Sequence, residues 1–205
     1  DSQTRIEGEF KTSDVVTVDI PRELSARQDE ILASNQPDAV KLTMLAELTS
    51  AGTAEILSPK IAKAVEEVRK RAGNGPVGVV TGFESTARLL NLLLPEFKLV
   101  NTRTPGQQDH LVTNHSVILF DRELPFLTNF ESVVFVDYPW SGAVIDDAVG
   151  SAAVKSGTKS VTIIHMDGSL DDRIAVFAAR RRDSRASASH SAPPTVQEMR
   201  QLLRN

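Results

Sequence analysis

Residues 132–166 constrain the fold of this chain more than any other stretch. A short apolar, β-branched run, Val133–Val136, is followed by the turn Asp137–Trp140, a helix-compatible segment from Gly142 to about Val154, and a second apolar run, Val161–Met166. Short apolar runs bounded by turn residues are typical of buried strands. Ligands of open α/β sheets bind beyond the carboxyl ends of the strands, so a site is expected at the Asp137–Trp140 turn.

The same alternation extends over residues 77–182. The runs Val77–Thr81 and Ser116–Phe120 indicate two further strands, and Glu84–Leu94 and Leu170–Arg182 indicate helices. Strands that alternate with helices favour a mostly parallel sheet covered by helices on both faces, which is an α/β fold.

The chain divides into four parts by composition. We expect a flexible N-terminus at residues 1–13, a helical segment leading into the core at 14–75, the core lobe at 76–182, and a linker with a short C-terminal helix at 183–205. The second part begins with a strand, Val15–Ile20, and contains an amphipathic helix that follows Ser58, a residue type suited to an N-cap.

Composition excludes several function classes. Net charge is −4, so nucleic-acid contact requires a local basic patch. The chain has no cysteine, which excludes disulfides and thiolate metal sites. No apolar run approaches the roughly 20 residues that span a bilayer, and the N-terminus shows no signal-peptide pattern. We therefore expect an intracellular protein without a membrane partner, and cytoplasm, nucleus and virion interior are not distinguished.

Several segments share their order with one known lobe. SPKIAKAVEEV, PVGVVTGFESTARLLNLLL, VVFVDYPWSGAVIDDAVG and TKSVTIIHMDGSLDDRI are the main matching pieces, preceded by TVDIPRELSARQDEIL and KLTMLAELTSAG. In this order they resemble the second, C-terminal RecA-like lobe of Swi/Snf-type (superfamily-two) helicases and translocases, over about residues 15–182. The resemblance implies a RecA-like parallel sheet preceded by a helical segment, and it implies ATP and nucleic acid as the family's ligands.

The catalytic positions implied by the resemblance are altered. Active members carry two arginines in a Gln-x-x-Gly-Arg-x-x-Arg helix, and here Gly150 is kept while Ser151 and Val154 replace the arginines. An arginine finger contributes roughly 10³–10⁵ in rate. A loop that begins with Asp in the family begins here with Asp121 but lacks the glycine that follows it. No phosphate loop or Asp-Glu-x-His motif is present. We therefore expect no catalytic residue and no cofactor.

Candidate nucleic-acid contacts are the run Arg180, Arg181 and Arg182, with Arg185, and the single tryptophan, Trp140. The arginines fit either phosphate contact or a helix end followed by a basic or protein-docking tail. Trp140 fits base stacking, worth about 1–3 kcal/mol, or, as we prefer, the filling of a gap beside the turn. A second basic patch is predicted on the Ser58 helix, at Lys60, Lys63, Arg69, Lys70 and Arg71.

Two other features are interpreted as structural. Asp137 is either a site carboxylate or, as we prefer, a cap for its turn and the helix that follows. The histidines show no metal-ligand spacing, so no metal site is predicted; they are His110, His115, His165 and His190.

These observations lead to three hypotheses. The first is a degenerate, non-hydrolysing helicase-type lobe that acts as a nucleic-acid-binding or protein-interaction scaffold in a larger assembly, with DNA or RNA as possible partners. The second is the C-terminal half of an active ATP-dependent DNA translocase whose first lobe is missing or on another chain, with ATP as its ligand. The third is an unrelated doubly wound binding protein.

Overall fold

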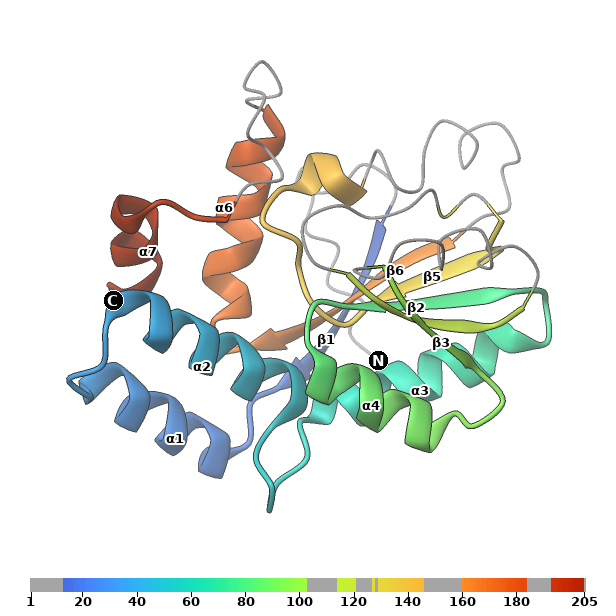
Figure 1. The fold of residues 1–205 in the computed structure, drawn as a ribbon, viewed down its shortest axis with the longest axis horizontal. Coiled ribbons are helices and arrows are strands. Elements are labelled where there is room, and N and C mark those ends of the chain that lie inside the picture. Colours follow the sequence, from blue (N-terminus) through green and yellow to red (C-terminus); the bar gives the residue numbers. More distant parts are fainter. Residues whose placement is uncertain are drawn as a thin grey trace.

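Six parallel strands form the central sheet of the computed structural model, which describes residues 13–102, 114–120, 127, 129–145, 160–183 and 193–204. The order across the sheet is β1-β6-β5-β2-β4-β3 (Figure 1). Every pairing between these strands is parallel, which confirms the predicted α/β class. The strands are β1 (Ser13–Asp19), β2 (Val77–Thr81), β3 (Lys98–Asn101), β4 (Ser116–Leu119), β5 (Ser132–Phe135) and β6 (Ser160–Asp167).

Successive side chains of these strands enter two separate apolar clusters, because neighbours along a strand point to opposite faces. Val79 belongs to the cluster covered by helices α3 (Pro59–Ala72) and α4 (Glu84–Leu93). Val80, the next residue, belongs to the cluster that includes side chains of helix α6 (Asp171–Asp183). The sheet therefore has helices on both faces.

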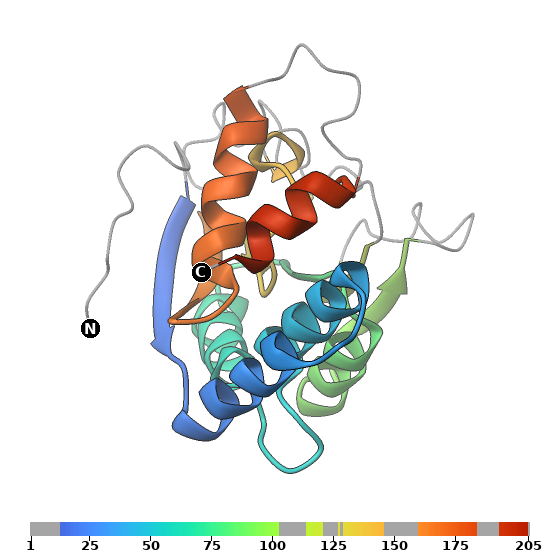
Figure 2. The ribbon, with the colours of Figure 1, turned by 90° about the vertical axis from the view of Figure 1, so that its left-hand side faces the viewer.

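Three more helices gather beside α6. They are α1 (Arg22–Ala33), α2 (Asp38–Ala51) and α7 (Val196–Leu203). Figure 2 shows α7 lying between α6 and α2, and α7 contacts both of these helices. Among the described helices, none is long and apolar enough to cross a membrane.

Residues 14–75 contribute directly to the same sheet as residues 76–182. β1 pairs with β6 along its whole length, from Ser13 with Val161 to Asp19 with Asp167. The helix predicted after Ser58 is α3, and the Ser58 hydroxyl accepts a hydrogen bond from the Lys60 backbone N–H at 3.3 Å. The helix predicted from Gly142 is described as far as Ile145, and its remainder lies outside the described residues.

Candidate functional site at the carboxyl edge of the sheet

Asp137 lies two residues after the end of β5, at the carboxyl edge where a site was predicted. Its carboxylate accepts hydrogen bonds from the Thr81 hydroxyl at 2.5 Å and from the Gly82 backbone N–H at 3.2 Å. Asp137 thus ties the end of β5 to the end of β2. The helical turn after it is capped instead by Ser141, whose hydroxyl accepts from the Ala143 N–H. The predicted capping of that helix by Asp137 is therefore replaced by a bond between strands.

The residue Asp137 is 8% exposed. Burial raises the pKa of Asp137. This rise is opposed by the positive charge of Lys60 and by the hydrogen bonds that the Asp137 side chain accepts. A buried carboxyl group whose Oδ2 already accepts two hydrogen bonds has a structural role, and its proton is harder to remove than that of an exposed aspartate.

Lys60 is fully buried, and its ammonium group bonds Asp171 Oδ2 at 2.6 Å. The same oxygen accepts the Met166 backbone N–H at 3.0 Å, at the end of β6. Because α3 and α6 lie on opposite faces, this ion pair joins the two helical layers around the strand ends. The prediction that Lys60 belongs to a surface basic patch is wrong, because Lys60 is buried and its ammonium group is paired with Asp171.

The rest of the predicted second patch is also paired in part. Lys63 lies 2.8 Å from Glu66, and Arg71 forms an ion pair with Glu67 one turn earlier on α3.

Buried hydroxyls complete the polar layer at this edge, since Ser50 of α2 and Thr86 of α4 share a hydrogen bond of 2.7 Å.

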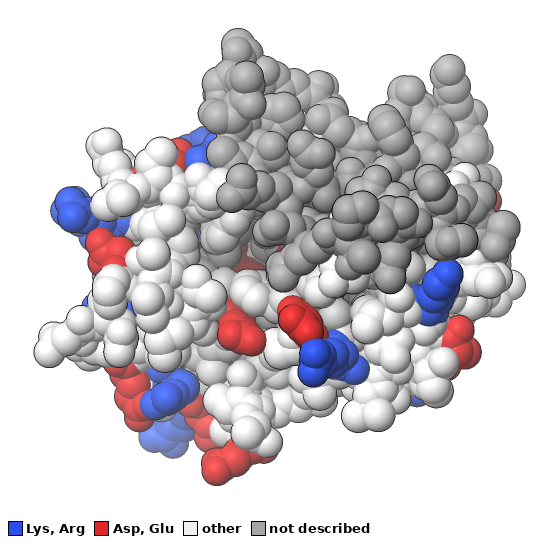
Figure 3. Space-filling model, viewed as in Figure 1, with Lys and Arg blue, Asp and Glu red and all other residues white. Residues whose placement is uncertain are grey.

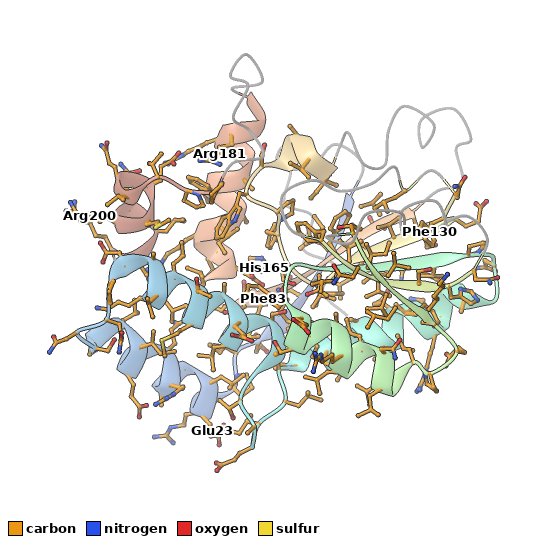
Figure 4. The ribbon with its side chains drawn as sticks, in the orientation of Figure 1. Glu23, Phe83, Phe130, His165, Arg181 and Arg200 are labelled. Atoms are coloured by element: carbon orange, nitrogen blue, oxygen red, sulfur yellow. The ribbon has the colours of Figure 1, made fainter. Side chains whose placement is uncertain are left out.

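The arginine run ends helix α6. Arg181 donates a hydrogen bond to Glu198 of α7 at 2.9 Å, and its guanidinium lies 4.6 Å from the centre of the Phe177 ring. Its side chain is only 13% exposed. Figure 4 shows Arg181 on α6 beside α7. Arg181 therefore links α6 to α7, and its role as a nucleic-acid contact stays a prediction.

The other predicted contacts differ in position. Trp140 meets the edge of Phe177 at 6.3 Å between ring centres and is partly buried, so it packs on α6. Arg180 is exposed on α6, and Arg182 is described in its backbone alone. Five predicted positions lie outside the described residues, namely Arg185, Asp121, Gly150, Ser151 and Val154.

His165 near the end of β6 takes part in a group that the sequence did not predict. Its Nδ1 atom is 2.8 Å from the Tyr138 hydroxyl, and its Nε2 atom is 2.8 Å from Asp172 Oδ1. Asp167 Oδ1 lies 3.5 Å from the same Nε2. A histidine at a strand end, with aspartates two and seven positions later, was the sequence signal for this cluster.

A groove of about 680 Å³ also lies between α1, α2, the residues that connect α2 to α3, and the start of α4. Met44 and Leu57 are its more exposed apolar side chains, and Arg27, Glu47 and Glu55 are its charged ones. Glu47 accepts a hydrogen bond from Ser85 at 2.7 Å, which ties α2 to the first turn of α4.

Known structures share this arrangement at low sequence identity. The C-terminal domain of a Sulfolobus solfataricus SWI2/SNF2 ATPase matches with a TM-score of 0.65 and 13% identity, covering 93% of this chain and 97% of that one. The C-terminal part of the Fun30 ATPase domain matches with a TM-score of 0.54 and 12% identity, covering 88% of this chain and 72% of that one.

The Sulfolobus solfataricus SWI2/SNF2 ATPase core in complex with dsDNA also matches, with a TM-score of 0.65 and 12% identity. This chain is covered over 93% of its length and spans about half, 49%, of that core. No protein-family model matches the sequence, and no curated protein sequence matches it. The chain therefore has the fold of the C-terminal RecA-like lobe of Swi2/Snf2 ATPases.

Proposed function

We propose that the chain is a degenerate, non-hydrolysing helicase-type lobe that serves as a protein-interaction scaffold in a larger assembly. The observation that carries this proposal is the bonding of polar groups at the carboxyl edge. Lys60 bonds Asp171 and Thr81 bonds Asp137, all in the interior. A ligand at the ends of β2 and β5 would have to displace these buried bonds, which is strongly unfavourable.

The charges of the described residues favour a protein partner over nucleic acid. Beyond the Arg181 bond to Glu198, Arg200 pairs with Asp38 and Arg88 pairs with Glu84. On the face seen in Figure 3, basic and acidic side chains of the described residues are interspersed. Paired cations neutralise fewer phosphates, so the gain from counterion release is small. DNA or RNA is therefore the less favoured partner.

Nucleic-acid and nucleotide titrations of the purified chain test this proposal. We expect no ATP turnover, and no salt-dependent binding of duplex or single-stranded DNA or RNA at 50 mM against 200 mM salt, the range over which phosphate contacts lose affinity by roughly 10³-fold or more. Low-salt affinity that disappears in the double variant R180A/R182A would establish nucleic-acid binding instead. Arg181 is left intact in that variant, because its replacement also loosens α7.

A second candidate is the C-terminal half of an active ATP-dependent DNA translocase. The match to about half, 49%, of an ATPase core in complex with dsDNA favours it. This candidate requires the arginines of the phosphate-contacting helix to come from elsewhere, and ATP to bind between this lobe and another. Adding a separately purified Swi2/Snf2 first lobe and duplex DNA should then give ATP turnover. Absence of ATP hydrolysis in that mixture would eliminate the candidate.

A further inference from the structure

We propose that His165, Asp167 and Asp172 form a binding site for a divalent transition-metal ion, with Zn²⁺ as the best-fitting ion. Each side chain offers one ligand atom, and these atoms all lie within 4.8 Å of one another. The cluster stands at the carboxyl end of β6 and the start of α6, beside but separate from the Lys60–Asp171 ion pair. Figure 4 shows His165 near the first turn of α6.

The distances between the ligand atoms suit one small ion. His165 Nε2 lies 2.8 Å from Asp172 Oδ1 and 3.5 Å from Asp167 Oδ1. Around tetrahedral Zn²⁺, with ligands at roughly 2.0–2.2 Å, neighbouring ligand atoms are about 3.3–3.6 Å apart. The Asp167 pair already has this spacing. The Asp172 pair reaches it by opening less than about 1 Å, within the rotation of one exposed carboxylate.

The imidazole is held with one nitrogen facing the carboxylates. The Tyr138 hydroxyl bonds Nδ1 at 2.8 Å, and the Tyr138 ring meets the His165 ring edge-on at 5.7 Å. When Nδ1–H donates to the Tyr138 oxygen, the Nε2 lone pair points toward Asp167 and Asp172. Metal-ligating histidines are oriented in this way by a partner on their other nitrogen.

The backbone between the ligands is also fixed. Gly168 has a φ of 76°, a left-handed conformation that glycine adopts without strain, and this turn follows β6 directly. The Gly168 N–H donates to Asp172 Oδ2 at 3.0 Å, so Asp172 presents its other oxygen to His165. The turn therefore brings a carboxylate from α6 back onto a histidine from β6.

The cluster is open to solvent on the side of its two aspartates. The His165 side chain is 6% exposed, whereas those of Asp172 and Asp167 are 46% and 65% exposed. An ion can enter from solvent and keep a fourth position for water or for a ligand from a partner. One imidazole with two carboxylates selects Zn²⁺-like ions over Mg²⁺ and Ca²⁺, which prefer oxygen ligands alone.

Isothermal titration of ZnCl₂ into the chain, first stripped with a chelator, tests the proposal. We expect one saturable site whose affinity falls at least tenfold in D167N and is lost in H165Q. D167N changes the most exposed ligand, so it leaves the core intact. D29N, an equally conservative change at an exposed aspartate on α1, should bind as the wild type does.

A second readout keeps the result independent of folding. Zn²⁺ should shift the His165 ring resonances in the wild type and in D29N, and should raise the Tm of both by more than that of D167N. Absence of binding, or equal binding by D167N and the wild type, would overturn the site and leave the cluster as a hydrogen-bonded His–Asp pair. Neither outcome alters the scaffold proposal, which rests on the Lys60 and Asp137 bonds.

Discussion

Replacing Lys60 with Met tests the buried network at the carboxyl edge most directly. Lys60 is 0% exposed and its partner Asp171 is 3% exposed, at an N–O distance of 2.6 Å. The same positive charge opposes the rise that burial causes in the pKa of Asp137. Met fills nearly the same space without a charge, so K60M leaves two carboxyl groups in the interior without their cation.

The expected loss is large because one partner of a buried pair is left behind. Removal of one member of such a pair costs about 3–5 kcal/mol. For a chain of this length, 1 kcal/mol corresponds to about 2–4 °C in Tm, so Tm should fall by about 6–20 °C. The double variant K60M/D171N also removes the charge of Asp171, the direct partner of Lys60, and keeps an oxygen for the Met166 N–H. It should recover to within about 2 kcal/mol of the wild type.

Urea denaturation, followed by circular dichroism and by Trp140 fluorescence, measures both variants. K63M is the matched control, because Lys63 lies one turn later on α3 in a partly exposed pair with Glu66. It should lose less than about 1 kcal/mol. A loss in K60M no larger than that in K63M, or a K60M/D171N variant less stable than K60M alone, would contradict this role of the Lys60–Asp171 pair.

Three further predictions concern the edge of the sheet and the C-terminal helix. R181A should speed amide exchange in α7 several-fold, and unchanged exchange would contradict the role of the Arg181–Glu198 bond. Burial opposes ionisation of Glu198, but the hydrogen bonds from the helix cap and from Arg181 outweigh it and lower its pKa, so the docking of α7 should weaken as pH falls below about 4. Because burial raises the pKa of Asp137, wild-type stability relative to D137N should decrease as pH rises from about 4 through the folded-state pKa, whereas a pH-independent difference in urea midpoints would oppose it. F177A should shift Trp140 emission to longer wavelength, and an unchanged spectrum would show that Phe177 does not shield it.

The strands were predictable because their signal is local. Val77–Thr81 has the predicted limits, and the other predicted strands differ from the observed ones by one or two residues at their ends. An apolar, β-branched run between turn residues has few alternatives to a buried strand, so the sequence sufficed. The pairing of β1 with β6 was less accessible, because it joins residues nearly 150 positions apart.

The roles of charged residues were not predictable in the same way. Lys60 and Lys63 occupy one helix and have the same charge, yet one is buried and the other is partly exposed. Their difference depends on Asp171, 111 positions away in the sequence. Arg181 likewise depends on Glu198 of a helix that follows a low-complexity segment. Sequence pattern gives the location of a charge along an element but not its partner.

The carboxyl edge therefore divides into two chemically different halves. At the ends of β2 and β5, Thr81 donates a buried hydrogen bond to Asp137, and the charge of Lys60 lies nearby. A ligand there would have to compete with bonds that are already formed in the protein interior. At the end of β6, the side chains of Asp167 and Asp172 are exposed, and only the imidazole of His165 is buried. Binding there requires rotation of exposed side chains rather than disruption of the core. Ligand binding at this edge is therefore expected at His165 and not at the Asp137 turn that the sequence indicated.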